Sequence, residues 1–318
     1  MAARGTTAAG AVRSAARVIA PLLLALLAAC SDAPGETSAD LPPASPLLYE
    51  IASADGTVEG WMFGTIHALP SGAKWRTPEV GRSIDAADFL VVEIAALGDD
   101  AALGQTYAAL STSPALPPIT ARVPPELTGQ LSGLLARGGY SQDSFATTET
   151  WAAALALARI DATGDPANGV DRALIADFKG RPVREFEGAA AQLGIFDTLP
   201  EAQQRAMLAA VVHDSETARR DPARLQRAWM AGDAATIAAS TREGILADPA
   251  LHEALLAARN RRWAAMLVPM LKQSPRPLVA VGTAHLVGPE GLAALLEAQG
   301  YRIRRLSPPE AAPATPAP

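Results

Sequence analysis

Four-residue motifs that end in histidine occur twice in this chain, near opposite ends of the sequence. Residues 64–67 read Gly-Thr-Ile-His and residues 282–285 read Gly-Thr-Ala-His. Each motif follows a run of apolar residues and precedes a loop that contains proline or glycine. The chain has only four histidines, so two of them, His67 and His285, share one local context. We expect both at the carboxyl ends of strands, where open α/β sheets bind their ligands.

A carboxylate occupies the same kind of position in a third apolar run. Residues 89–94 read Phe-Leu-Val-Val-Glu-Ile, which is typical of a strand buried on both faces, and Glu93 lies near its carboxyl end. Two imidazoles and a carboxylate at three strand ends suit a divalent metal with open coordination positions. The candidate metal ligands are therefore His67, Glu93 and His285. The alternative for each histidine is a capping or core role without a ligand.

Strand-like runs lie near both ends of the chain and flank a middle rich in helix signals. The first runs predict a hairpin around the turn at residues 55–56, and the last predict a β-α-β unit with a parallel strand pair and a right-handed crossover. The sequence thus predicts an α/β fold, with a mixed β-sheet built from the N- and C-terminal segments and a helical middle insertion. The predicted strands are residues 47–52, 59–66, 89–94, 182–187, 278–282 and 301–306, and the predicted helices are residues 124–138, 149–162, 171–179, 200–219 and 290–299, with two more opened by Asp-Pro pairs at 221 and 248.

The N-terminus predicts a bacterial lipoprotein signal peptide over residues 1–29. Three arginines precede a 12-residue apolar run at residues 18–29, which is shorter than the roughly 20 residues that span a bilayer. The run ends in Leu-Ala-Ala-Cys, which resembles a lipobox, so Cys30 is the predicted lipidation site. The alternative is an ordinary signal peptide with an incidental cysteine. Several acyl chains on Cys30 would anchor the mature chain firmly, and the serine that follows favours the outer membrane, facing the periplasm.

Charge and composition exclude several classes of function. Residues 1–29 contain three arginines and no acidic residue, so their removal takes the net charge from −6 to −9. An acidic domain argues against nucleic acid as a partner. Cys30 is the single cysteine, so lipidation leaves no thiol for a disulfide. Residues 30–46 are polar and Pro-rich and predict a flexible tether, residues 47–306 predict one domain, and residues 307–318 predict a disordered Pro/Ala-rich tail.

The domain resembles the TraB/PrgY/GumN family over residues 47–306. The paired Gly-x-x-His motifs are the most specific mark of this resemblance. It also rests on the segments FGTIHALP, LVVEI, GVDRAL, FEGAAAQL, WMAGD, AARNRRW and VGTAHLVGPEGLAALLEAQGYRIRRL. The family is related to the Tiki proteins and, more distantly, to erythromycin esterase-like and ChaN-like proteins. The resemblance implies a metal-dependent hydrolase-like site, with the proteolytic activity attributed to Tiki members.

Further catalytic candidates follow from the same resemblance. Matching motif positions carry Glu187, Asp171, Arg259 and Asn260. Glu187 is the candidate general base, although its motif reads Phe-Glu-Gly here where the family more commonly has Leu-Glu-Thr. Arg259 is a candidate for stabilising a developing oxyanion and Asn260 for orienting a ligand. The alternative for Asp171 is to cap the helix that follows it.

These observations predict a lipid-anchored envelope protein that acts as a metal-dependent hydrolase. The predicted partners are the membrane, through the anchor, and a peptide substrate, and the predicted cofactor is a divalent metal ion. A metal at this site would lower the pKa of a bound water and polarise the bond that is cleaved. The rival prediction is a non-catalytic periplasmic binding protein, which sequesters a peptide or supports envelope assembly through the same cleft.

Overall fold

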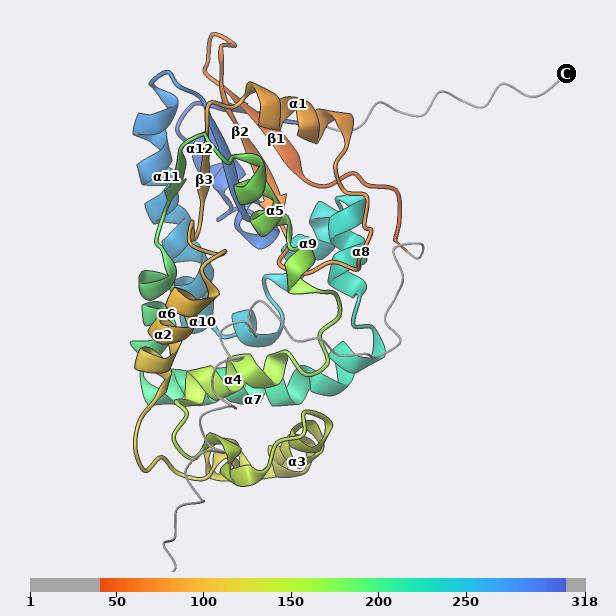
Figure 1. Ribbon diagram of the computed structural model, residues 1–318, viewed down its shortest axis with the longest axis vertical. Coiled ribbons are helices and arrows are strands. Elements are labelled where there is room, and N and C mark those ends of the chain that lie inside the picture. The colour runs from red at the N-terminus through yellow and green to blue at the C-terminus, as the bar shows by residue number, and fades with distance from the viewer. Residues whose placement is uncertain (1–40, 307–318) are drawn as a thin grey trace, which may run out of the picture.

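The computed structural model describes residues 41–306 (Figure 1). The predicted signal peptide, Cys30 and the C-terminal tail lie outside the described residues, so the predictions made for them stay predictions. A six-stranded sheet runs through the described domain in the order β4-β3-β5-β2-β1-β6. Its strands are β1 (Leu48–Ala52), β2 (Val58–Thr65), β3 (Phe89–Val92), β4 (Val183–Glu185), β5 (Pro277–Gly282) and β6 (Arg302–Arg305).

The sheet is mixed and joins the two ends of the domain. β2, β5, β3 and β4 pair in parallel, while β1 pairs antiparallel with β2 on one side and β6 on the other. The predicted hairpin and fold class are confirmed. The predicted pairing of the last two strands is wrong, because β5 pairs with β2 and β3, and the β1–β2 hairpin lies between β5 and β6.

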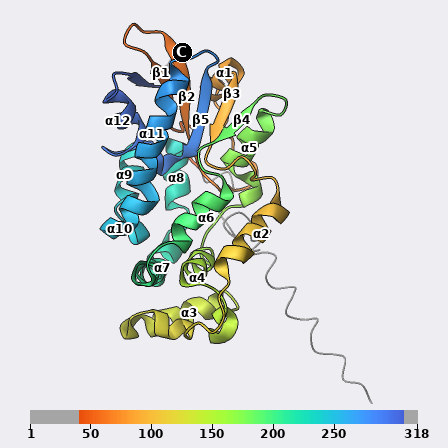
Figure 2. The same ribbon diagram turned by 90° about the vertical axis from the view of Figure 1, so that its left-hand side faces the viewer.

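Helices cover both faces of the sheet and form a separate layer beyond one end of it (Figures 1 and 2). They are α1 (Pro78–Ala86), α2 (Asp100–Ser111), α3 (Thr128–Arg137), α4 (Thr150–Ala158), α5 (Val170–Asp177), α6 (Ala189–Asp197), α7 (Glu201–Arg220), α8 (Arg224–Ala231), α9 (Ala234–Ser240), α10 (Pro249–His252), α11 (Ala258–Leu271) and α12 (Leu292–Glu297). Residues 253–257, between α10 and α11, form one π-helical turn.

Alternation along β5 divides its side chains between two cores. Leu278 and Ala280 pack with residues of α1, α5 and α8, whereas Val279 and Val281 pack with residues of α11 and α12. This two-residue period is what a strand buried on both faces requires. A third core joins α3, α4 and α7, and a fourth joins α2, α6 and the start of α4. The helices α2 and α6 thus lie between the sheet and the α4–α7 layer (Figure 2).

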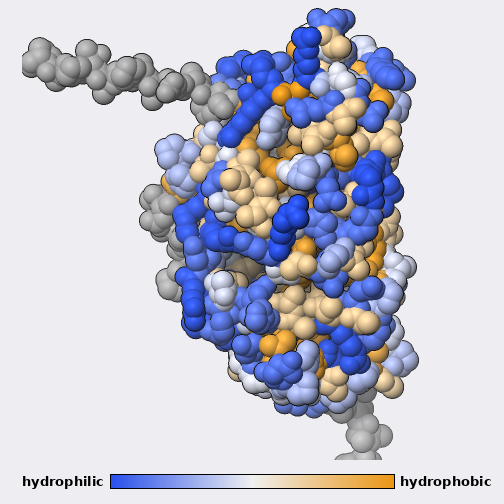
Figure 3. Space-filling view, turned by 180° about the vertical axis from the view of Figure 1, so that it is seen from behind, coloured by the Kyte–Doolittle hydropathy of each residue, from blue (hydrophilic) through white to orange (hydrophobic). Residues whose placement is uncertain are grey.

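The surface of the described domain is mixed in character. Figure 3 shows hydrophilic and hydrophobic side chains interspersed over the face turned away from Figure 1. Among residues 41–306, the large apolar side chains that are clearly exposed are Leu225 and Met266. None of the helices in this range is both long and apolar enough to cross a membrane.

Candidate active site

The candidate residues follow three adjacent strands of the sheet. β5 lies between β2 and β3, and Thr65 of β2 is paired with Gly282 of β5. Because these strands are parallel, the chain leaves all three at the same edge. His67, Glu93 and His285 each lie within three residues of a strand end. The structure therefore places the three predicted ligands along one edge of the sheet.

The two Gly-Thr-x-His motifs interlock, which explains their glycines. The Thr283 hydroxyl donates a hydrogen bond to the Thr65 carbonyl oxygen at 2.8 Å. A Cβ atom on Gly64 would lie 2.6 Å from the Thr283 Oγ1, which is too close for any side chain. A Cβ atom on Gly282 would lie 3.3 Å from Oε1 of Glu93, whose carboxylate accepts a hydrogen bond from the Gly282 N–H at 2.8 Å. Glycine at both positions lets the strand ends approach closely.

Arg259 lies at the centre of a buried polar cluster behind this edge. Its Nη2 donates to Oε2 of Glu93 and to Oε2 of Glu187, both at 2.8 Å, and its guanidinium lies over the ring of Trp263. Burial alone would raise the pKa of the Glu93 carboxyl, but the positive charges of protonated His285 and of Arg259 outweigh burial and lower that pKa to about 2. Glu93 is therefore ionised throughout the physiological range.

The contacts of His285 determine its tautomer. Arg259 Nη1 lies 3.2 Å from Nε2 of His285, and because a guanidinium only donates, Nε2 must accept. The ring proton is then on Nδ1, which donates to Oδ1 of Asn260 at 2.6 Å. The Asn260 amide is itself oriented by donating to the Glu290 carbonyl at 2.7 Å. Burial is the main cause that lowers the pKa of His285 to about 4, so the ring is neutral at pH 7.

The position of Arg259 affects whether His285 can bind the predicted metal ion. With Arg259 in this position His285 does not fit as a ligand, because its Nε2 lone pair faces a cation and its Nδ1 carries the proton. Within the described residues, no group of three or more His, Cys, Asp or Glu is arranged to hold a metal ion. The divalent metal stays a prediction, and the chemistry argued below uses only side chains of the chain itself.

His67 forms a second cluster with Asp171. Nδ1 of His67 is hydrogen-bonded to Oδ2 of Asp171, and the negative charge of that carboxylate is the main cause that raises the pKa of His67 to about 9. The Asp171 side chain is buried, whereas the His67 side chain is 54 % exposed. Asp171 lies in the first turn of α5 but is not its N-cap, which is Gly169. The Oδ1 of Asp171 accepts a hydrogen bond from the Arg172 N–H at 3.0 Å, so the Asp171 carboxylate contacts both the start of α5 and His67.

Gly169 brings the start of α5 against the His67 loop. The Val170 N–H donates to the Ile66 carbonyl at 2.9 Å. A Cβ atom on Gly169 would lie 2.6 Å from the His67 carbonyl oxygen and 2.8 Å from Oδ1 of Asp171. A side chain at this position would push the helix away, so the glycine of the GVDRAL segment keeps His67 and Asp171 in contact.

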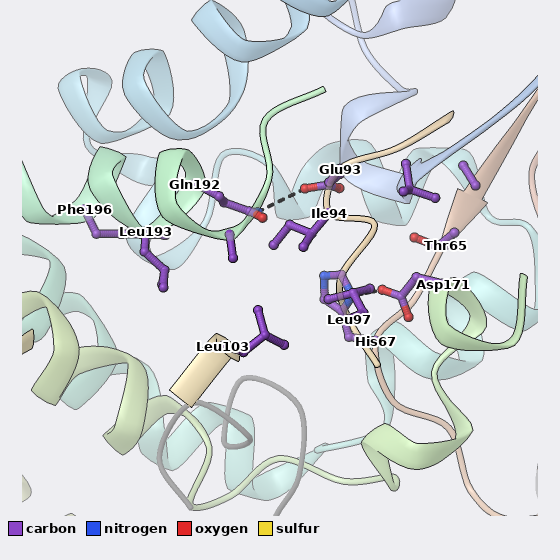
Figure 4. A pocket seen from close by; sticks show the side chains of 13 residues that line it. Thr65, His67, Glu93, Ile94, Leu97, Leu103, Asp171, Gln192, Leu193 and Phe196 are labelled. Atoms are coloured by element: carbon purple, nitrogen blue, oxygen red, sulfur yellow. Dashed lines mark hydrogen bonds and ion pairs between the residues drawn. The ribbon is translucent and has the colours of Figure 1, made fainter. Parts of the chain in front are cut away.

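A pocket of about 120 Å³ opens beside these two clusters (Figure 4). Its polar end holds His67, Asp171, Glu93 and Gln192, and Gln192 Nε2 donates to Oε2 of Glu93 at 3.1 Å. Sequence reasoning missed Gln192, although it lies in the FEGAAAQL segment that carried the resemblance. The full lining is Thr65, His67, Val92, Glu93, Ile94, Leu97, Leu103, Asp171, Ala189, Gln192, Leu193, Phe196 and Ala280.

Glu187, the predicted general base, lies in the buried cluster outside the described lining of this pocket. Its two carboxylate oxygens accept hydrogen bonds from Arg259, from Arg262 and from the indole N–H of Trp263. The backbone N–H of Glu187 also donates to the Glu93 carbonyl oxygen at 3.3 Å. These contacts tie Glu187 to Arg259 and Glu93.

Comparison with known proteins identifies the family of the chain. The model of the TraB/PrgY/gumN family matches residues 47–305, which include both histidine motifs and the helix that carries Arg259. The chain belongs to this family. No curated protein and no solved structure matches the chain.

Proposed function

We propose that this TraB/PrgY/gumN family member is a hydrolase that uses His67 to move the proton of an attacking water. The observation that carries the proposal is the His67–Asp171 pair at the polar end of the pocket. A carboxylate on Nδ1 holds the neutral imidazole in the tautomer whose Nε2 accepts a proton. Nε2 of His67 has no hydrogen-bond partner among residues 41–306, so it can face a water in the pocket. It accepts the proton of that water only in the neutral ring, which becomes the major form above the raised pKa of about 9.

Glu93 supplies a second acceptor in the same pocket. Because Arg259 and the Gly282 N–H keep its carboxylate ionised, Glu93 can accept a hydrogen bond from the attacking water while His67 takes the proton. Arg259 itself is buried and donates to Glu93, Glu187 and the Leu255 carbonyl. We therefore assign Arg259 and Glu187 to positioning Glu93, in place of the oxyanion and general-base roles expected from the resemblance.

The test is hydrolysis by the purified chain of fluorogenic peptides and of p-nitrophenyl esters. His67→Gln should reduce kcat/KM by about 10²–10⁴-fold, the usual contribution of a general base. The matched control is His213→Gln, because His213 is an exposed histidine on α7 and is not among the lining residues of the pocket. Equal activity in the two variants would overturn the proposal. Binding of a ligand without any turnover would favour the rival, a non-catalytic binding protein.

The divalent metal and the lipid anchor are separate proposals with separate tests. Elemental analysis of the chain purified without chelator, compared with His67→Ala, tests the metal through its content. If His67, Glu93 and His285 hold a metal ion, the metal content per chain should be lower in His67→Ala than in wild type. Mass spectrometry of the membrane fraction tests the anchor, because Cys30→Ala should remove the mass of the acyl chains. A wild-type chain without acyl chains would contradict it.

A further inference from the structure

We infer that the wall of the pocket opposite His67 is a subsite for a short aliphatic group of the substrate, next to the bond that is hydrolysed. The inference rests on the proposed function and names its substrate class. The wall consists of Leu103 from α2 and of Leu193 and Phe196 from α6. Figure 4 shows Leu103, Leu193 and Phe196 on the side of the pocket away from Asp171.

The two ends of the pocket differ sharply in chemistry. His67, Glu93, Asp171 and Gln192 supply all the charged and amide groups that line it, and the wall from α2 and α6 is entirely apolar. A charged or strongly polar substrate group placed against this wall would lose its hydration and gain no partner. An aliphatic group would lose only contact with water, which is favourable. The wall therefore selects for an apolar group.

The volume of the pocket limits the size of that group. At about 120 Å³ it is somewhat smaller than the 150 Å³ apolar cavity that holds benzene in a well-studied engineered protein. A group of about four or five carbons, either a short acyl chain or an aliphatic amino-acid side chain, fits this space. Longer chains would have to leave the pocket or displace the wall.

The wall is preformed, which argues against a simple packing defect. Leu103 and Leu193 are buried in one core with Trp151. The rings of Trp151 and Phe196 stack at 6.0 Å between centroids. Behind the wall the packing is therefore close, as in an ordinary protein core.

One helix connects the wall to the catalytic carboxylate. Gln192 and Leu193 are adjacent on α6, so the residue that donates to Glu93 is next to one that forms the wall. A group seated against Leu193 would thus lie at a fixed place relative to Glu93 and His67. This arrangement makes the aliphatic group a positioning handle for the reacting bond.

A chain-length series tests the subsite. The purified full chain is assayed with straight-chain p-nitrophenyl esters from acetyl to decanoyl and with peptides that place alanine or leucine before the cleaved bond. We expect kcat/KM to rise about fourfold for each methylene up to four or five carbons, since each buried methylene contributes about 0.8 kcal/mol, and to stop rising beyond that length. Whether the ester or the peptide arm shows the preference distinguishes an acyl chain from a side chain.

Two variants change the size of the subsite. Leu193→Trp should fill it and remove the chain-length preference, and Leu103→Ala should move the optimum to longer chains. The matched control is Leu225→Trp, because Leu225 is exposed on α8 and outside the pocket lining. Equal rates for all chain lengths with wild type, or the same preference in Leu193→Trp as in Leu225→Trp, would overturn the inference.

Binding of uncharged primary amides, from acetamide to decanamide, separates this inference from the proposed hydrolysis. Calorimetry should give the tightest binding at four or five carbons and a loss of at least tenfold in Leu193→Trp. If this pattern appears without ester or peptide turnover, the subsite stands and the proposed hydrolase fails. If turnover is present but neither rate nor binding depends on chain length, the hydrolase stands and the subsite fails.

Discussion

The guanidinium of Arg259 lies 3.2 Å from Nε2 of His285, and this contact makes His285 a hydrogen-bond acceptor toward α11. The same guanidinium donates to Glu93 and Glu187, so one buried cation is hydrogen-bonded to two carboxylates and an imidazole. It places a buried positive charge at the edge of the sheet where the sequence also predicts a metal ion. The helix that carries Arg259 is preceded by a π-helical turn, a local irregularity frequently found at functional sites.

Loss of this cation should destabilise the fold. Arg259→Ala leaves Glu93 and Glu187 buried without their main partner, and breaking a buried ion pair costs about 3–5 kcal/mol. Urea unfolding at pH 7 measures the change in the free energy of unfolding. Arg262→Ala is the control, because Arg262 also contacts Glu187 but is largely exposed, and it should cost at most about 1 kcal/mol. Equal losses in the two variants would show that Arg259 is no more important than a surface partner.

The strand ends could be predicted because their signals are local. Apolar runs before His67 and His285, and around Glu93, indicate buried strands, and parallel strands end at one edge. The repetition of the Gly-Thr-x-His motif was visible in the sequence. The contact between Gly64 and Thr283, which accounts for part of it, was visible only in the structure. The resemblance to the family added Asp171 and Arg259, which no spacing rule would have selected.

The partners of these residues could not be predicted, because they come from distant segments. Arg259 and Glu93 are 166 residues apart, and Asp171 and His67 are 104 apart. No periodicity of the sequence encodes such contacts. The order of the strands in the sheet could not be predicted for a similar reason. A β-α-β pattern in the sequence does not reveal that the β1–β2 hairpin lies between its two strands. Gln192 and the wall of the pocket were missed because neither α2 nor α6, which carry them, was among the helices predicted from the sequence.

Glu93 should make the domain sensitive to acid. Its folded-state pKa of about 2 lies below the unfolded value of about 4.3, so its stabilising contribution is present above pH 4.3 and is lost as the pH falls through about 2. Glu93→Gln has no carboxyl to titrate at this position. Relative to this variant, wild type should therefore lose about 3 kcal/mol of unfolding free energy between pH 5 and pH 2. Urea titrations at several pH values measure it. Glu126→Gln, at an exposed position, should instead run parallel to wild type throughout.

The interlocked motifs predict a compensating pair of substitutions. Gly64→Ala places a Cβ atom against the Thr283 side chain and should cost about 1–3 kcal/mol by overpacking. Thr283→Gly removes that side chain together with its hydrogen bond to Thr65, and should cost about 1 kcal/mol. Added to Gly64→Ala, it should be less harmful than the sum of the two single changes. Strict additivity in a thermal or urea double-mutant cycle would mean that the two motifs do not contact each other.

The His67–Asp171 pair predicts both a titration and a rate profile. A His67 pKa raised to about 9 means that the pair stabilises the fold fully below the unfolded value of about 6.5 and loses this contribution as the pH rises through 9. The stabilisation should be small, since the His67 side chain is half-exposed to water. NMR titration of the His67 ring should give about 9 in wild type and a value nearer 6.5 in Asp171→Asn.

The rate profile follows from the same equilibrium. Only neutral His67 can accept the proton of water, so kcat/KM should rise with pH, reach half of its plateau near pH 9 and level off above that pH. In Asp171→Asn the rise should move toward pH 6.5, because the charge that holds the proton is gone. The plateau should fall about 10²–10⁴-fold, because the ring loses the carboxylate that orients it. Asp177→Asn removes a carboxylate from the other end of α5, where Asp177 is bonded to Arg76, and should leave the profile unchanged. A rise at the same pH in wild type and Asp171→Asn would mean that His67 is not the group that titrates in the reaction.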